Sequence, residues 1–256
     1  MTAKLSAVIV TQNEERNIER CLRSVRFADE IVVVDAFSED RTAEIARRLG
    51  ARVVTRTWDG FAPQKQFAID QAGGEWVLLV DSDEEVSGEL AKEIRSAVAQ
   101  NARPPAGFRI RRSNYFLGDP MPFGPWGKDN TIRLFRRTLG AVAPRPVHEG
   151  VRVDGDVGTL DGPLFHHTHQ TLSDSFRRLN RYTTLEAVER VGRRRIRLFD
   201  VVVPPLGVFL RYYIIGTCWK AGTRGFLLSA ITAMYRSVLY LKMYLLQKEK
   251  CDHTVP

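Results

Sequence analysis

The first hundred residues alternate between short apolar runs and longer segments in which apolar residues recur every three or four positions. A continuous apolar run is typical of a buried strand, whereas the wider spacing is typical of a helix with one buried face. The pattern predicts strands at residues 5–10, 30–34, 52–54 and 76–80, and helices at residues 17–25, 42–49, 63–72 and 87–100. Strands that alternate with helices indicate an α/β fold with a mostly parallel sheet and helices on both faces.

Three of the predicted strands are followed by polar residues. Thr11 follows the first, Asp35 the second, and Asp81 and Asp83 the fourth. The carboxyl ends of parallel strands lie on one edge of a sheet, which is where open α/β sheets bind their ligands. Two carboxylates one residue apart suit Mg²⁺ or Mn²⁺ bound to a diphosphate, although an acidic turn that caps the next helix would have the same spacing. The turn after the first strand contains no glycine, which argues against a dinucleotide-binding fold.

Three segments of this half resemble a known family in their order and spacing. The segments are residues 10–18, 32–42 and 79–84, and they resemble the inverting family 2 glycosyltransferases. The resemblance implies a GT-A fold, which is a Rossmann-like fold for nucleotide-diphospho-sugar transferases. It also implies a mostly parallel sheet at the donor site.

The resemblance assigns roles in donor binding to residues at matching positions. Thr11, Glu14 and Asp35 would hold the nucleoside, and Lys65 would approach its diphosphate. Asp81 would bind the ribose or the metal ion. The expected donor is a nucleotide sugar, and UDP-glucose in particular.

The resemblance also implies a divalent cofactor, Mg²⁺ or Mn²⁺. Asp83 would be its principal ligand, and Asp81 is a second candidate. Of His166, His167 and His169, His166 matches the family position best, and imidazole is a suitable ligand for Mn²⁺. The alternative is that all three histidines lie at the surface or at strand ends.

The second half of the chain narrows the resemblance to one subgroup. A strand is predicted at residues 107–112, a loop rich in glycine and proline at residues 114–125, and a helix from about residue 173 to residue 190. With the motifs around them, these elements resemble the bacterial transferases that add glucose to the inner-core heptose of lipopolysaccharide. The chain is therefore expected to move a hexose from a UDP-sugar to a lipopolysaccharide-core acceptor. The alternatives are a transferase that acts on another lipid-linked or surface-polysaccharide acceptor, or an inactive nucleotide-sugar-binding membrane scaffold.

An inverting transfer needs a general base for the acceptor hydroxyl and a Lewis acid for the departing diphosphate. Glu149 is the favoured base, because members of the family carry an acidic residue at this position. Asp129 and His148 are the alternatives. A structural hydrogen bond would explain His148 equally well.

Charge is unevenly distributed along the chain. Residues 1–100 carry a net charge of −5 and the remainder +13. Arginines concentrate at residues 133–137, near the presumed acceptor side, and at residues 177–197. Such a surface suits a phosphorylated acceptor or an anionic membrane. Nucleic acid is not an expected partner, because no recognised nucleic-acid module is present. The three widely spaced cysteines indicate a reducing compartment and no zinc site.

Residues 199–247 are apolar but interrupted by Pro204, Pro205 and several charged residues, so no membrane-spanning helix is predicted. An apolar stripe at helical spacing consists of Leu227, Ile231, Met234, Val238, Leu241 and Leu245. Such a helix either packs on the core of its own protein or lies in a membrane interface, and the neighbouring tyrosines and basic residues favour the interface.

These patterns together predict the domains and the location of the protein. We expect a GT-A domain at residues 1–170, a basic helical extension at residues 171–247 and a tail at residues 248–256. The protein is expected to be cytoplasmic and peripheral on the inner face of the cytoplasmic membrane.

Overall fold

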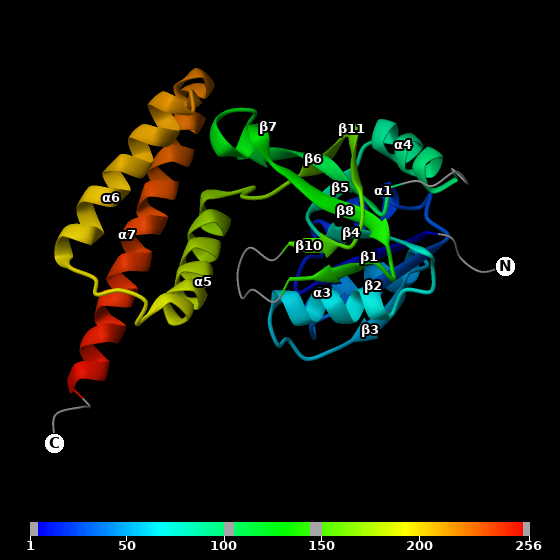
Figure 1. Ribbon diagram of the computed structural model, residues 1–256, viewed down its shortest axis with the longest axis horizontal. Helices are drawn as coiled ribbons and strands as arrows, with labels where there is room; N and C mark the ends of the chain where they lie inside the picture. Colours follow the sequence, from blue (N-terminus) through cyan, green and yellow to red (C-terminus); the bar gives the residue numbers. More distant parts are fainter. Residues whose placement is uncertain (1–4, 100–104, 144–149, 253–256) are drawn as a thin grey trace. The chain divides into compact units, whose positions relative to one another are not determined.

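The computed structural model describes residues 5–99, 105–143 and 150–252 (Figure 1). The chain divides into two compact units. The N-terminal unit comprises residues 1–113 and 129–167, and the C-terminal unit comprises residues 114–128 and 168–256. The residues expected to bind the donor and the metal ion all belong to the N-terminal unit.

In the part of the chain that the structure describes, the main sheet has the strand order β3-β2-β1-β4-β8-β6-β11-β5. Its parallel half consists of β3 (Arg52–Thr55), β2 (Glu30–Asp35), β1 (Leu5–Thr11) and β4 (Trp76–Asp81). Its other half consists of β8 (Asn130–Arg136), β6 (Gly107–Phe116), β11 (Val157–His166) and β5 (Glu84–Val86). There β8 is antiparallel to β4 and to β6, and β11 is antiparallel to β5. The predicted parallel sheet is confirmed for β1 to β4, and the later strands make the sheet a mixed one.

Helices cover both faces of the parallel half, as predicted (Figure 1). Ala7 and Ile9 of β1 share a buried cluster with residues of α1 (Ile18–Ser24), α2 (Thr42–Arg48) and α4 (Gly88–Ala99). Val8 and Val10 share the other cluster with residues of α3 (Phe61–Asp70). Successive side chains of a strand face opposite sides of a sheet. The continuous apolar run of β1 therefore reflects burial on both faces.

Three features of the strands differ from those expected from the sequence pattern. β6 continues to Phe116, into the predicted loop, and pairs there with β7 (Asp119–Pro120). β5 forms within the acidic segment that follows β4. β9 (Gly140–Val142) and β10 (Val151–Val153) form a separate two-stranded sheet among the described residues.

The C-terminal unit is helical. Its described helices are η1 (Gly124–Lys128), α5 (Leu172–Arg190), α6 (Leu198–Leu210), η2 (Arg211–Ile215), η3 (Cys218–Ala221) and α7 (Gly222–Asp252). The residues of α7 that are buried in clusters with α5 are Leu228, Ile231, Leu239 and Met243. Met234, Leu241 and Leu245 of the predicted apolar stripe are exposed. Only part of the predicted stripe therefore packs against the rest of the unit.

α6 and η2, which together span Leu198–Ile215, form the one stretch among the described residues that is long and apolar enough to cross a membrane. The stretch is largely exposed in spite of its apolar composition. Pro204 and Pro205 lie within it. A helix that lies in a membrane interface can have the same length and composition.

Candidate active site

The carboxyl ends of three neighbouring strands bring Thr11, Asp35 and Asp81 to one edge of the sheet. Thr11 lies opposite Asp35 in the pairing of β1 with β2, and Val10 lies opposite Asp81 in the pairing of β1 with β4. Thr11, Asp35 and Asp81 are the last residues of their strands. The structure therefore places these three predicted site residues together.

Asp35 organises the loop that follows β2. It is 2% exposed, and its carboxylate accepts hydrogen bonds from the backbone N–H (3.0 Å) and the hydroxyl (2.6 Å) of Ser38. The Ser38 hydroxyl accepts a bond from the backbone N–H of Asn13 at 2.8 Å, which joins the loops after β1 and β2. Phe37 has a left-handed φ of 53° and is 61% exposed. A non-glycine residue keeps such a backbone only where its surroundings fix it, and here the result is an exposed aromatic ring two residues after Asp35.

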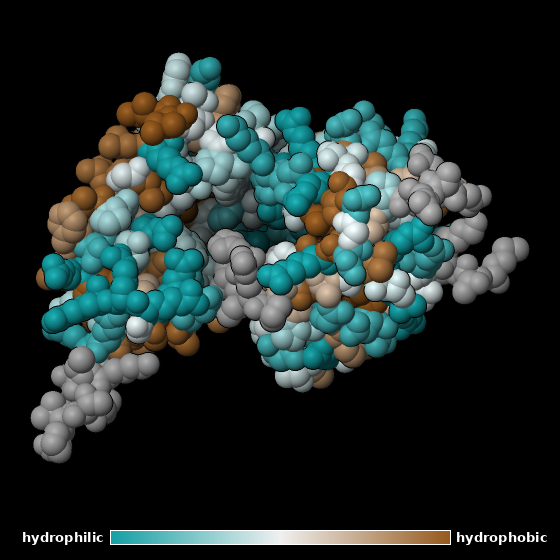
Figure 2. Space-filling view, viewed as in Figure 1, coloured by the Kyte–Doolittle hydropathy of each residue, from teal (hydrophilic) through white to brown (hydrophobic). Residues whose placement is uncertain are grey.

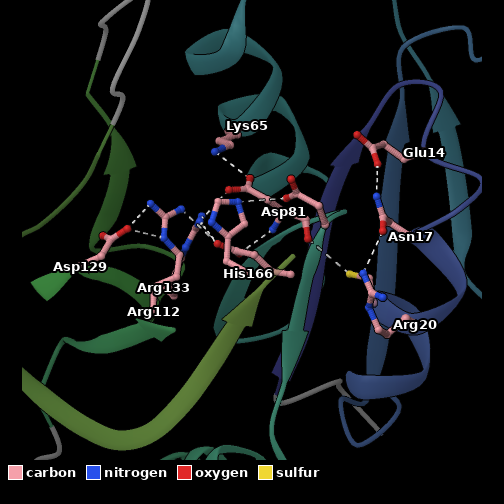
Figure 3. Close-up of polar contacts among 12 residues, drawn as sticks. Glu14, Asn17, Arg20, Lys65, Asp81, Arg112, Asp129, Arg133 and His166 are labelled. Carbon is pink, nitrogen blue, oxygen red and sulfur yellow. Dashed lines mark hydrogen bonds and ion pairs between the residues drawn. The ribbon is translucent and has the colours of Figure 1, made fainter. Parts of the chain in front are cut away.

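Glu14 lies in the loop after β1. Its backbone N–H donates to the hydroxyl of Thr42 at 2.8 Å. Its carboxylate accepts from Nδ2 of Asn17 at 2.7 Å (Figure 3). These bonds hold the loop against the starts of α1 and α2, so Glu14 shapes the edge on which Thr11 and Asp35 lie.

Asp81 lies between two cations (Figure 3). Its Oδ1 is 2.8 Å from Nζ of Lys65, and its Oδ2 is 2.6 Å from Nη2 of Arg133. Burial alone would raise the pKa of Asp81, but Arg133 and Lys65 outweigh it and hold the pKa well below its usual range. Asp81 is therefore ionised, and both of its carboxylate oxygens contact a cation.

Glu84 is fully buried and connects the arginines of the site to Asp81. Its Oε1 is 2.6 Å from Nη2 of Arg133 and 3.3 Å from Nη1 of Arg112. Its Oε2 accepts from the backbone N–H of Asp81 at 2.9 Å. Buried charges are tolerated when they are paired and hydrogen-bonded. Arg133 is itself buried against the carboxylate of Asp81, and its expected position near the acceptor side stays a prediction.

Asp129, a candidate base, is paired with Arg112. Its Oδ2 is 2.7 Å from Nε and 2.5 Å from Nη2 of that arginine. These charge-assisted bonds hold the Asp129 carboxylate against the guanidinium of Arg112. The other candidate bases, His148 and Glu149, lie in residues 144–149, outside the residues that the structure describes. The choice of base therefore stays a prediction.

Asp83 and His166 form the predicted metal-binding pair. Nε2 of His166 is 3.5 Å from Oδ1 of Asp83. The pairing of β11 with β5 places His166 opposite Glu84, one residue after Asp83. No group of three or more His, Cys, Asp or Glu residues is arranged to hold a metal ion within the described part of the chain. One carboxylate and one imidazole still fit Mn²⁺ or Mg²⁺, because these ions take further ligands from a diphosphate and from water.

The other two histidines have different neighbours. Nε2 of His167 lies 3.0 Å from Oε2 of Glu85, which also has Arg20 at 3.6 Å. Burial and the charge of Arg20 lower the pKa of His167. Nδ1 of His169 lies 2.9 Å from the hydroxyl of Ser175 in the C-terminal unit. His166 is therefore the histidine whose ring faces Asp83.

Sequence reasoning missed Gln64, which is fully buried in the first part of α3. Its Nε2 donates to the carbonyl of Arg56 at 3.4 Å, and the backbone N–H of Arg56 donates to the carbonyl of Asp35 at 3.0 Å. Gln64 Oε1 and Thr11 Oγ1 are buried without a hydrogen-bond partner among the described residues. Buried polar atoms are rarely left in this state, so both are candidates for contacts with a ligand. A polar residue at a position on the buried face of the predicted helix could have identified Gln64 from the sequence.

The parallel sheet, the acidic residues at its carboxyl edge and the antiparallel strands that follow define a GT-A transferase fold. The chain belongs to glycosyl transferase family 2, whose family model matches residues 6–137.

Relatives of known sequence match almost the whole chain. The lipopolysaccharide core biosynthesis glycosyltransferase LpsC of Rhizobium meliloti (strain 1021) is 30% identical over 94% of this chain and 92% of its own length. An uncharacterized glycosyltransferase of Rickettsia typhi is 31% identical over 94% of this chain and 86% of its own length. Among solved structures, S. aureus TarS 1-349 matches with a TM-score of 0.47 and 14% identity, over 98% of this chain and 92% of that chain.

Proposed function

We propose that this chain is an inverting glycosyltransferase that moves a hexose, expected to be glucose, from a UDP-sugar to a lipopolysaccharide-core acceptor. Membership of family 2 supports the class of reaction, and the similarity to LpsC supports the class of acceptor. The observation that carries the proposal is the carboxyl edge of the sheet. There Asp81 is held between Lys65 and Arg133, next to the Asp83–His166 pair.

The residues at this edge suit different parts of a nucleotide sugar. Thr11 and Asp35 lie on adjacent strands and would contact the nucleoside. Asp81, kept ionised by its two cations, would accept hydrogen bonds from ribose hydroxyls. Lys65 would compensate the charge of the diphosphate. Asp83 and His166 would hold Mg²⁺ or Mn²⁺, which supplies Lewis-acid stabilisation of the departing diphosphate.

For the general base we propose Glu149, with His148 as the alternative. Either group would take the proton of the acceptor hydroxyl as that oxygen bonds to the anomeric carbon and the bond to the diphosphate breaks. Asp129 is less suited to this role, because its Oδ2 is already bonded to Nε and Nη2 of Arg112.

We further propose that the protein is cytoplasmic and works at the inner face of the cytoplasmic membrane. A lipopolysaccharide-core acceptor, or another lipid-linked glycan, is anchored in a membrane, so the transferase has to reach that surface. The exposed apolar residues of α6 support a peripheral attachment. Nucleic acid is not among the proposed partners.

Calorimetry of UDP binding tests the donor site. The wild type should bind UDP more tightly in the presence of Mn²⁺ than in its absence, and Asp83→Ala should lose this metal-dependent part. Asp70→Ala is a matched control, because Asp70 is the exposed last residue of α3, more than one helical turn beyond Lys65. It should bind UDP like the wild type.

Transfer of glucose from UDP-glucose to fragments of lipopolysaccharide core tests the acceptor. UDP binding without this transfer, but with transfer to another lipid-linked glycan, would support the alternative acceptor. If UDP, GDP and ADP all fail to bind with any metal ion, the donor site is wrong and the inactive scaffold becomes the better description.

A further inference from the structure

The C-terminal unit contains a pocket that the proposed reaction does not use. Its volume is about 240 Å³. Its polar lining consists of Arg211, Tyr212, Thr232, Tyr235 and Arg236. Because these residues come mainly from η2 and α7, beside the end of α6, we refer to it as the α6–α7 pocket. All of its lining belongs to one compact unit.

The α6–α7 pocket is positively charged. Arg211 and Arg236 have no salt bridge to a carboxylate among the residues that the structure describes, and Arg236 only stacks on the ring of Tyr240 at 5.7 Å. The nearby Glu186 is neutralised by Arg190 at 2.9 Å and accepts a bond from the Tyr235 hydroxyl at 2.5 Å. Burial raises the pKa of Tyr212 while both pocket arginines act in the opposite direction. The Tyr212 hydroxyl therefore stays protonated and can act as a donor in the pocket that Arg211 and Arg236 also line.

An exposed apolar face runs along α6 beside this pocket. The exposed fractions are 58% for Leu206, 44% for Leu210 and 57% for Ile214. Toward the start of the helix the face continues through Phe199 and Val202, which are also exposed. Figure 2 shows hydrophobic residues gathered over α6. Contiguous apolar surface of this kind marks a contact with a membrane or with another protein.

We propose that the α6–α7 pocket binds the phosphate head group of an anionic membrane lipid, with the acyl chains of that lipid along the apolar face of α6. Guanidinium groups bind phosphate oxygens through paired, charge-assisted hydrogen bonds, and the tyrosine hydroxyl adds a neutral donor. Pockets that enclose a whole drug-sized ligand measure roughly 300–1,000 Å³. The smaller volume of the α6–α7 pocket suits a head group and leaves the acyl chains outside it.

A second copy of this chain is a poorer occupant of the apolar face, because both ends of α6 are basic. Arg195 and Arg197 precede the helix, and Arg211 and Lys220 follow it. If two copies packed antiparallel, the basic start of one α6 would meet the basic end of the other. If they packed parallel, the two starts would meet and the two ends would meet. Both arrangements juxtapose like charges, whereas anionic lipid head groups match the charge at both ends.

This site extends the proposed membrane location and does not depend on the donor chemistry. Flotation of the full chain with lipid vesicles tests it. Vesicles of phosphatidylcholine with phosphatidic acid should bind the wild type, and vesicles of phosphatidylcholine alone should bind it much more weakly. The double variant Arg211→Gln, Arg236→Gln should bind the phosphatidic acid vesicles about tenfold more weakly.

The matched control is the double variant Arg193→Gln, Arg224→Gln. It changes the net charge equally at two exposed arginines outside the pocket, which pair with Glu189 and Asp119. Its affinity for the same vesicles should change by about twofold or less. Equal losses of vesicle affinity in the two double variants would mean that general electrostatic attraction causes the binding. That result would contradict a lipid site in the α6–α7 pocket.

Two further measurements distinguish the lipid from other sources of phosphate and from misfolding. Inorganic phosphate should displace the vesicles no better than chloride at equal ionic strength, and full displacement by phosphate would identify a site for the free ion instead. The helical circular dichroism and the thermal unfolding transition of the wild type should be retained in both double variants, which shows that they are folded. Failure of UDP binding in the wild type would contradict the proposed function but not the lipid site, whereas failure of the wild type to bind any vesicle would contradict the lipid site alone.

Discussion

Arg133 connects a buried carboxylate to a carboxylate of the donor site. Its guanidinium lies 2.6 Å from Asp81 and 2.6 Å from Glu84, and the residue is 5% exposed. Glu84 in turn accepts a bond from the backbone of Asp81. The three residues therefore hold one another in place. The position of the Asp81 carboxylate depends on Arg133, which lies outside the motif at residues 79–84.

We expect Arg133→Met to lower the free energy of unfolding by about 3–5 kcal/mol, because it leaves Glu84 buried without its main partner. It should also weaken UDP binding, since Asp81 loses one of its two cations. Urea unfolding and calorimetry measure these effects. The control is Arg136→Met in the same strand, whose partner Glu75 has a 62% exposed side chain. That change should cost less than about 1 kcal/mol, and equal costs in the two variants would contradict the special role of Arg133.

A substitution of Gln64 can separate an effect on the stability of the fold from an effect on UDP binding. Its Oε1 has no partner among the described residues, and the bond from its Nε2 is long at 3.4 Å. We expect Gln64→Met to leave the melting temperature unchanged or to raise it, because an apolar side chain of similar shape removes a buried, unsatisfied group. It should weaken UDP binding by up to about tenfold if that oxygen accepts a bond from the nucleotide.

Thermal unfolding and calorimetry check both parts of this prediction. Gln71→Met, at the C-terminal end of the same helix, is the control and should change neither quantity. A lower melting temperature with unchanged UDP affinity would show that Gln64 serves only the packing of α3.

At the scale of elements, three predicted strands are each one residue shorter than the observed ones, and the additional residue is one of the predicted site residues. β1 extends to Thr11, β2 to Asp35 and β4 to Asp81. The hydrophobic pattern reports where side chains are buried, so it ends at the first polar residue. The backbone pairing continues through that residue, because Thr11 and Asp35 lie opposite each other in register. The parallel half of the sheet and its polar edge could thus be predicted from the sequence.

The antiparallel half and its contacts could not be predicted in the same way. The apolar pattern of β8 indicates burial but does not identify β4 and β6 as its partners. The bond from Arg133 to Asp81 joins residues 52 positions apart, which no local pattern records. The composition of α6 likewise does not determine which of its residues are exposed. These contacts depend on how distant strands and helices meet, and only the folded chain shows them.

At the scale of the whole molecule, the proposed donor site and the proposed lipid site belong to separate units. The predicted donor and metal-binding residues belong to the N-terminal unit, whereas the α6–α7 pocket belongs to the C-terminal unit. Charge also differs between the units, with a net charge of −1 in the N-terminal unit and +9 in the C-terminal unit. A basic unit with exposed apolar residues suits an anionic membrane.

The dependence of global stability on pH provides a test of the Asp81 centre. Arg133 and Lys65 overcome the effect of burial, so the pKa of Asp81 is lower in the folded protein than in the unfolded chain. A group of this kind contributes stability that is fully present above its unfolded pKa, about 3.9, and that is lost as the pH falls through the folded value. Asp81→Asn should therefore destabilise the protein at neutral pH, and its difference from the wild type should shrink below about pH 4.

Urea unfolding of the wild type and of Asp81→Asn between neutral and acidic pH measures this difference directly. Asp59→Asn is the control, because Asp59 pairs with Arg56 in a setting where its side chain is 46% exposed. That variant should differ little from the wild type at any pH, since exposed ion pairs contribute little. A difference for Asp81→Asn that stays constant into the acidic range would show that the two cations do not lower the pKa of this carboxylate. The ionised state that the proposed ribose contact requires would then have lost its support.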